Sequence, residues 1–288
     1  MTNPEKSLTS GGFGGGAPKG RQLWADSHCH IHDARLDAAA CVAAALEQGV
    51  GLMVTVGCDE ATTNAAVGVA GAEHVAPVWA TAGLHPHDAT DGLSWIRPLL
   101  DRAEELRIVG VGECGLDYYY EHSPRDVQQR IFAEQIQLAH EYKLPLVIHT
   151  RNAWDDTFAV MAAEGTPATT IFHCFSGGPE EAAACMALGP GVYLSYSGIV
   201  TFSTAEELRA AAAITPLDRM LVETDSPYLA PMPYRGKKNQ PAYVPFVGTR
   251  IAEVKGLPVD QVARETFSAT VRAFGLSKDG SQRGNIVA

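Results

Sequence analysis

The strongest constraint on the fold is a regular alternation of short apolar runs with longer stretches of helical character. The runs are rich in β-branched and apolar residues, which is typical of buried strands. They span residues 23–28, 52–56, 78–82, 108–112, 146–149, 170–173, 192–195 and 220–224. We expect helices between them at 35–48, 60–70, 94–106, 124–142, 154–163, 179–188 and 205–213, and after them at 243–254 and 258–274.

Strands that alternate with helices indicate a parallel sheet. Eight such units over about 250 residues match a closed (β/α)8 barrel, the TIM barrel of α/β proteins. An open, doubly wound sheet is the alternative, but it favours a glycine-rich fingerprint after the first strand, and here residues 28–32 read HCHIH. We therefore expect one barrel domain over 23–276, a flexible glycine-rich tail over 1–22 and a C-terminal tail over 277–288.

Charge and composition narrow the classes of function. The net charge of −11 argues against an extended basic surface for nucleic acid, so any polyanion binding would depend on bound cations and local basic loops. No apolar run reaches the ~18 residues of a membrane span, and residues 1–20 lack the apolar centre of a signal peptide. We expect a cytoplasmic protein with no membrane association and no obligatory protein partner.

The six cysteines show no C-x-x-C spacing. This pattern is typical of reduced thiols that act as small packing residues. Cys29, Cys114 and Cys174 are neighbours of candidate metal ligands. Because side chains alternate along a strand, we expect these three thiols to point away from the ligands.

Metal-competent side chains recur where the predicted strands end. His28 and His30 are two residues apart, so both project from the same face of the first strand. Active sites of (β/α)8 barrels lie at the C-terminal ends of the strands. Six such side chains at the ends of five strands predict a metal site there: His28, His30, Glu113, His149, His173 and Asp225.

The ligand types indicate which metals could bind. Imidazole and carboxylate without thiolate suit Zn, Mn, Fe or Ni, or Mg with waters. Six ligands are too many for one tetrahedral site with an open position. They fit two divalent ions, Mg, Mn or Zn, ~3.5–4 Å apart. Glu113 is the natural bridge, because its strand lies between the two groups of histidines in barrel order.

A second set of residues at the same end could bind substrate. In the loop after the third strand, His85 and His87 could contact a phosphate or a leaving group, or be ordinary polar loop residues. Glu223 could orient a ligand or form a salt bridge within the barrel. Four cationic side chains could bind phosphate or belong to solvated loops: Arg151, Arg235, Lys237 and Lys238. The three tyrosines at 118–120 could stack nucleic-acid bases or pack at the start of a helix.

Six motifs in order resemble the TatD family of metal-dependent deoxyribonucleases, within the amidohydrolase superfamily. They are HCH (28–30), GECGLDYY (112–119), IHTR (148–151), HCFSG (173–177), ETDSPYLAP (223–231) and RGKKNQP (235–241). The resemblance covers residues 23–276. It implies that His28, His30, Glu113 and Asp225 hold one metal, and that Glu113, His149 and His173 hold the other.

The chain also departs from the family pattern. Ala269 stands where the family often has an asparagine, and Arg272-Ala273-Phe274 follows it. The glycine-rich N-terminal stretch is additional. Glu113 occupies the place where many members of the superfamily carry a carboxylated lysine, in agreement with the TatD branch. Neither Ala269 nor the N-terminal stretch affects the predicted ligands.

The resulting hypothesis is a metal-dependent hydrolase that cleaves phosphodiester bonds of DNA as an exonuclease. A hydroxide activated by the two metals would attack phosphorus, with Glu113 and Asp225 as catalytic residues and Asp225 taking the proton of the water. One alternative keeps the metals and cleaves an amide, a lactone or a small phosphoester. Another is a non-catalytic barrel that serves as a scaffold, which the complete ligand set argues against.

Overall fold

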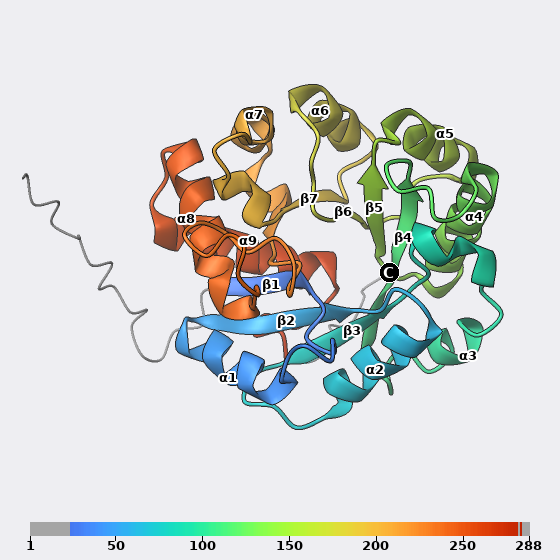
Figure 1. The fold of residues 1–288 in the computed structure, drawn as a ribbon, viewed down its shortest axis with the longest axis horizontal. Coiled ribbons are helices and arrows are strands. Elements are labelled where there is room, and N and C mark those ends of the chain that lie inside the picture. The colour runs from blue at the N-terminus through green and yellow to red at the C-terminus, as the bar shows by residue number, and fades with distance from the viewer. Residues whose placement is uncertain (1–23, 282, 284–288) are drawn as a thin grey trace, which may run out of the picture.

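The computed structural model describes residues 24–281 and 283. Eight parallel strands follow one another around a barrel in the order β1 to β8, and the helices surround them (Figure 1). This confirms the predicted (β/α)8 architecture. The strands are β1 Trp24–Cys29, β2 Val50–Val56, β3 Val78–Ala82, β4 Ile108–Asp117, β5 Leu146–Arg151, β6 Thr170–Phe172, β7 Val192–Tyr196 and β8 Met220–Val222.

The helices fall close to their predicted positions, with one exception. They are α1 Ala38–Glu47, α2 Glu60–Gly71, α3 Arg97–Leu100, α4 Arg125–Tyr142, α5 Trp154–Glu164, α6 Pro179–Ala187, α7 Glu206–Ile214, α8 Val244–Lys255 and α9 Val259–Ala273. The helix predicted over 94–106 is wrong in extent. After Leu100 the chain continues in turns, where the amide of Arg102 bonds the carbonyl of Leu99 at 3.1 Å and that of Ala103 bonds Leu100 at 3.0 Å.

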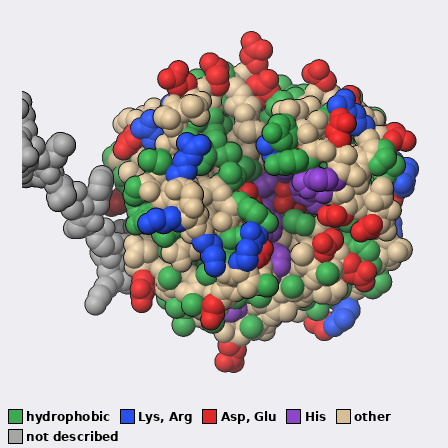
Figure 2. Space-filling view, in the orientation of Figure 1, with side chains coloured by type: hydrophobic (Ala, Val, Ile, Leu, Met, Phe, Trp, Pro, Cys, Tyr) green, Lys and Arg blue, Asp and Glu red, His purple; other side chains and the backbone are tan. Residues whose placement is uncertain are grey.

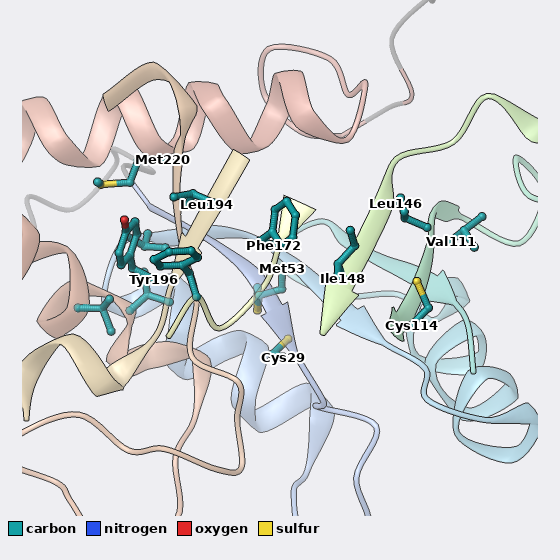
Figure 3. Close-up of a cluster of buried hydrophobic side chains, with 14 of the residues drawn as sticks. Cys29, Met53, Val111, Cys114, Leu146, Ile148, Phe172, Leu194, Tyr196 and Met220 are labelled. Carbon is teal, nitrogen blue, oxygen red and sulfur yellow. The ribbon is translucent and has the colours of Figure 1, made fainter. Parts of the chain in front are cut away.

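Alternation along the strands separates two layers of apolar side chains. In β5, Leu146 and Ile148 face the helices, while Val147 faces the barrel interior. The outward layer is drawn in Figure 3 and includes Met53, Val111, Leu146, Ile148, Phe172, Leu194, Tyr196 and Met220. The interior layer includes Leu52, Val54, Trp79, Val109, Val147, Ile171, Tyr193 and Leu221. Where a strand is regular, a residue two positions beyond an interior residue returns to the interior, at the mouth of the barrel. The register of β4 shifts between Ile108 and Val111, so Val109 faces the interior and Val111 faces outward.

Polar contacts close the barrel between β1 and β8. The buried carboxylate of Asp26 accepts the backbone N–H of Thr224 at 2.9 Å and its hydroxyl at 2.5 Å. Ser27 Oγ donates to the carbonyl of Val222 at 3.1 Å. The amide of Asp225 bonds the carbonyl of His28 at 2.9 Å. These bonds take Thr224 out of the strand ladder, which explains why β8 ends before the predicted residue 224. They also hold His28 beside Asp225.

The opposite end of the barrel is closed by the last part of the chain. Ala269, Phe274 and Leu276 belong to the interior apolar cluster, so Ala269 lies far from the mouth. Trp79 Nε1 donates to the carbonyl of Gly280 at 2.8 Å, which ties residues of the predicted C-terminal tail to the barrel. The predicted N-terminal tail lies outside the described residues. No helix in the described part of the chain is long and apolar enough to cross a membrane.

Two glycines provide a test of how α8 packs on the barrel. A Cβ atom at the buried Gly248 in α8 would overlap the ring of Trp24, whereas a Cβ at Gly68 in α2 would meet no heavy atom within 4 Å. We expect Gly248→Ala to lower the free energy of unfolding by about 1–3 kcal/mol through overpacking. Gly68→Ala should raise it by about 0.5–1 kcal/mol, because alanine favours the helix.

Thermal and chemical unfolding of both variants would measure this difference. Equal effects of the two substitutions, in either direction, would show that α8 does not press on Trp24.

Candidate metal centre

The six predicted ligands converge at the mouth of the barrel. A pocket of about 750 Å³ opens there, and its walls include five of them: His30, Glu113, His149, His173 and Asp225. His28 lies below and is buried. Figure 2 shows histidine side chains gathered in a hollow near the centre of the visible face. The interior register explains the convergence, because His149 and His173 each follow an interior apolar residue by two positions.

One group of ligands surrounds one oxygen of the Glu113 carboxylate. His28 Nε2 lies 3.3 Å and His30 Nε2 lies 3.9 Å from Glu113 Oε2. Asp225 Oδ1 lies 3.9 Å from His28 Nε2 and 3.3 Å from His30 Nε2. The Nε2 atoms of the two histidines are 3.3 Å apart. Four donor atoms from β1, β4 and the end of β8 thus enclose one small volume.

A second group surrounds the other oxygen of the same carboxylate. His173 Nε2 lies 2.8 Å and His149 Nδ1 lies 3.0 Å from Glu113 Oε1. His85 Nε2 approaches the same oxygen to 3.5 Å. The two oxygens of Glu113 therefore face two separate sets of imidazoles, which is the arrangement required of a bridging carboxylate.

Hydrogen bonds behind the imidazoles fix which nitrogen faces the centre. His30 Nδ1 donates to the carbonyl of Val56 at 2.8 Å, so its Nε2 is free to present a lone pair. His149 Nε2 donates to Asp117 Oδ2 at 3.1 Å, and His173 Nδ1 donates to Glu223 Oε1 at 3.2 Å. Such partners orient metal-binding histidines and raise their basicity.

The donor set fits divalent cations. His149 Nδ1 and His173 Nε2 each direct a lone pair at a carboxylate oxygen, and two acceptors at such distances require a proton or a cation between them. His173 Nε2 is also buried without a hydrogen-bond partner among the described residues. Imidazole nitrogens and carboxylate oxygens together suit Zn, Mn and related ions.

The electrostatics of Glu113 agree with a cation site. Burial raises the pKa of Glu113, but the charges of His173 and His85 and the close contacts with His149 and His173 reverse this, so the pKa lies well below its usual value. Burial likewise lowers the pKa of His173, but attraction to Glu113 and Glu223 raises it well above the usual range. The centre thus holds a buried carboxylate anion that draws positive charge to its neighbours.

Asp117 is a carboxylate of the centre that sequence reasoning missed. Its Oδ2 accepts from His149 Nε2 and from His87 Nε2, each at 3.1 Å, and its Oδ1 accepts the amides of Tyr119 and Tyr120 at 2.9 Å. Burial raises the pKa of Asp117, but these bonds lower it below its usual value. In the structure β4 continues to Asp117, and Glu113 and Asp117, an even number of residues apart, both face the centre.

Two cysteines lie in the pocket, contrary to the expectation for the thiols. Cys58 Sγ is 3.5 Å from Glu113 Oε2, and Cys174 Sγ is 3.2 Å from Ser197 Oγ. Both residues line the pocket. They follow the ends of β2 and β6, where strand alternation no longer decides direction, and Cys174 has a φ of 42°. Cys29 and Cys114 do pack in the outward layer, as expected, and all six cysteines are free.

The predicted substrate residues separate into two groups. His85, His87 and Arg151 line the pocket. The three basic residues after β8 do not, and their side chains are engaged elsewhere. The Arg235 guanidinium lies 4.4 Å from the centre of the Phe202 ring, Lys238 Nζ donates to the carbonyl of Arg35 at 2.6 Å, and Lys237 Nζ lies 6.0 Å from the Tyr234 ring.

Comparison with known proteins agrees with this geometry. Residues 25–275 match the family model described as TatD related DNase. The chain is 38% identical over 259 residues to the uncharacterized metal-dependent hydrolase YabD of Bacillus subtilis, which covers 88% of this chain and 99% of YabD. It is 33% identical over 214 residues to the 3'-5' ssDNA/RNA exonuclease TatD of Escherichia fergusonii, covering 72% and 81%.

Solved structures show the same fold. The TatD homolog YjjV of Escherichia coli K12 superposes with a TM-score of 0.81 at 27% identity, over 89% of this chain and 99% of YjjV. A hydrolase of the TatD family from Entamoeba histolytica gives 0.79 at 18% identity, over 88% and 98%. With its converging histidines and carboxylates, the chain belongs to the TatD family of metal-dependent hydrolases.

Proposed function

We propose that this protein is an exonuclease that hydrolyses phosphodiester bonds of DNA, with two divalent cations held at Glu113. The main support for two cations is that the two oxygens of one buried carboxylate face separate groups of imidazoles at the floor of an open pocket. The relative from Escherichia fergusonii is a 3'-5' ssDNA/RNA exonuclease, which supports nucleic acid as the substrate.

The ligands divide into two sets. His28, His30, Asp225 and Glu113 Oε2 would hold one cation. His149, His173 and Glu113 Oε1 would hold the other. Two bound cations polarise phosphoryl oxygens and bring the pKa of water towards neutrality. The donor types are compatible with Mg, Mn or Zn.

Asp225 is the proposed proton acceptor. Its carboxylate lines the pocket, and Oδ1 lies 3.3 Å from His30 Nε2. Burial raises the pKa of Asp225, but the close contact with His30 and the charge of His173 lower it below its usual value. The group is therefore ionised at neutral pH and can accept a proton from an attacking water.

Arg151 is the proposed phosphate-binding residue of the pocket wall. It extends from the end of β5 and lines the pocket, whereas the chain as a whole carries a net charge of −11. A guanidinium binds phosphate oxygens well. Local cations of this kind let a negatively charged protein approach a polyanion.

End-labelled DNA oligonucleotides provide the test of the reaction. Protein reconstituted with Mg²⁺, Mn²⁺ or Zn²⁺ should shorten them one nucleotide at a time from one end. Parallel assays should contain a lactone, an amide and a small phosphomonoester. Turnover of one of these compounds by metal-loaded protein that leaves DNA intact would contradict the proposed reaction.

Glu113→Gln should be the most damaging single change to the centre. The amide keeps the shape but offers one good acceptor oxygen and no charge. We expect metal content to fall from two ions per chain to one or fewer, and hydrolysis to fall by several orders of magnitude. Glu134→Gln, on the exposed face of α4 where Glu134 pairs with Arg130, is the matched control. Two tightly bound ions in the Glu113→Gln variant would disprove the bridge.

Asp117→Asn tests how His149 is oriented. The carboxylate accepts a hydrogen bond from His149 Nε2–H, which leaves Nδ1 free to face Glu113. An amide N–H at this place would favour the opposite tautomer, with the proton on Nδ1. We expect metal affinity to fall about 10–100-fold, as found when such partners are removed, and equilibrium dialysis would measure it. Unchanged affinity with normal folding would show that Asp117 does not orient the ring.

A further inference from the structure

Two arginine–tyrosine groups stand at the mouth of the pocket. In the first, which we name the β4–β5 pair, the Arg151 guanidinium lies 4.1 Å from the ring centre of Tyr119 and 4.7 Å from that of Tyr120. In the second, the β8–β1 pair, the Arg35 guanidinium lies 4.7 Å from the ring centre of Tyr228 and donates to its hydroxyl at 2.8 Å. Each group joins residues that lie at or just after the ends of two neighbouring strands.

The two groups lie on opposite sides of the metal centre. The strands follow in order around the barrel, so β4 and β5 are four places from β8 and β1. Tyr120 lies 5.4 Å from the ring of His87, on the side of His85 and His149. Tyr228 lies 6.3 Å from the ring of His30, on the other side. A phosphate bound at Glu113 would therefore have one arginine–tyrosine group on each side.

The exposure of these rings is unusual for the molecule. Tyr119 is 58% exposed, and Tyr120 and Tyr228 are each 51% exposed. Among the exposed large hydrophobic side chains of the described residues, these three are the aromatic ones. Arginine contacts hold each ring in place, so a base that stacks on it need not order the ring first.

We propose that the β4–β5 pair and the β8–β1 pair are base-stacking subsites for the nucleotides on the two sides of the cleaved phosphate. This inference rests on the proposed function and assigns its substrate contacts. Aromatic and arginine faces bind unpaired bases without sequence preference. In a duplex, neighbouring base pairs cover those faces, so the two subsites select an unpaired strand. The buried position of His28 and Glu113 requires the phosphate to enter the pocket, which an unpaired end can do.

The two subsites differ in charge. Asp33 neutralises Arg35, with Asp33 Oδ2 2.6 Å from Arg35 Nη2, and this hydrogen bond is the main reason that the pKa of Asp33 falls to about 2. No carboxylate within the described residues forms an ion pair with Arg151. The β4–β5 pair therefore binds phosphate as well as a base, while the β8–β1 pair binds a base alone.

Equilibrium binding separates the subsites from the reaction. The probe is a fluorescein-labelled single-stranded phosphorothioate DNA, intact or with an abasic tetrahydrofuran at each of the three terminal positions in turn. The metal-loaded full chain is compared with Tyr119→Leu/Tyr120→Leu and with Tyr228→Leu. Each variant should bind the intact probe about 5- to 100-fold more weakly, while the corresponding Phe variants should bind like the original chain.

Removing single bases from the probe tests stacking directly, because tyrosines with only a structural role would not make binding depend on the bases. An abasic residue at the position that contacts one subsite should weaken binding of the probe to the original chain. It should not weaken binding to the Leu variant of that subsite any further. Arg151→Gln should reduce the slope of log affinity against log salt by about 0.7, the value for one phosphate contact on a single strand. Arg35→Gln should leave the slope unchanged. Arg130→Gln, on the outer face of α4, is the control for charge alone.

The outcomes distinguish the two proposals. Binding that does not depend on the bases or on the tyrosines overturns the stacking subsites, whether or not DNA is hydrolysed. Additive losses from base removal and from the Leu substitutions overturn them as well. Base-dependent binding at both subsites without hydrolysis of the matching phosphodiester DNA would support the subsites and overturn the proposed reaction.

Discussion

The carboxylate of Glu113 is the contact on which the rest of the site depends. It is a buried anion whose two oxygens face different imidazoles, His28 and His30 on one side and His149 and His173 on the other. An isolated buried carboxylate would be costly, and compensation by imidazoles or by cations removes that cost. The surrounding hydrogen bonds then have a common effect, because each one turns an imidazole lone pair towards this group.

The barrel supplies the positions of these side chains through strand alternation. In β5 and β6 the residue two places after an interior apolar residue faces the mouth, so His149 follows Val147 and His173 follows Ile171. The seam between β1 and β8 places His28 beside Asp225, because Asp26 accepts a hydrogen bond from the amide of Thr224 and the carbonyl of His28 accepts one from the amide of Asp225. The ligands thus stand on rigid strand ends, while the loops beyond carry the side chains that can meet a substrate.

The sequence predicts the structure best where the two-residue alternation of a strand decides which way the side chains point. Alternation and the order of the motifs predict where the strands lie and which ligands meet. They do not predict three features of the site. Asp117 lies beyond the predicted end of the fourth strand, because β4 continues for five more residues than the 108–112 run. Cys58 and Cys174 follow strand ends, where turn geometry sets direction. Arg151 and Tyr119 meet only through the pairing of β4 with β5, a tertiary contact that neither local pattern contains.

The most direct measurement is a crystal structure of the Mn²⁺-loaded protein with anomalous scattering recorded near the manganese edge. The proposed arrangement requires two anomalous peaks, ~3.5–4 Å apart. One should lie between Glu113 Oε2, His28, His30 and Asp225, and the other between Glu113 Oε1, His149 and His173. A single peak at saturating Mn²⁺, or two peaks with no bond to Glu113, would contradict the central role of that carboxylate.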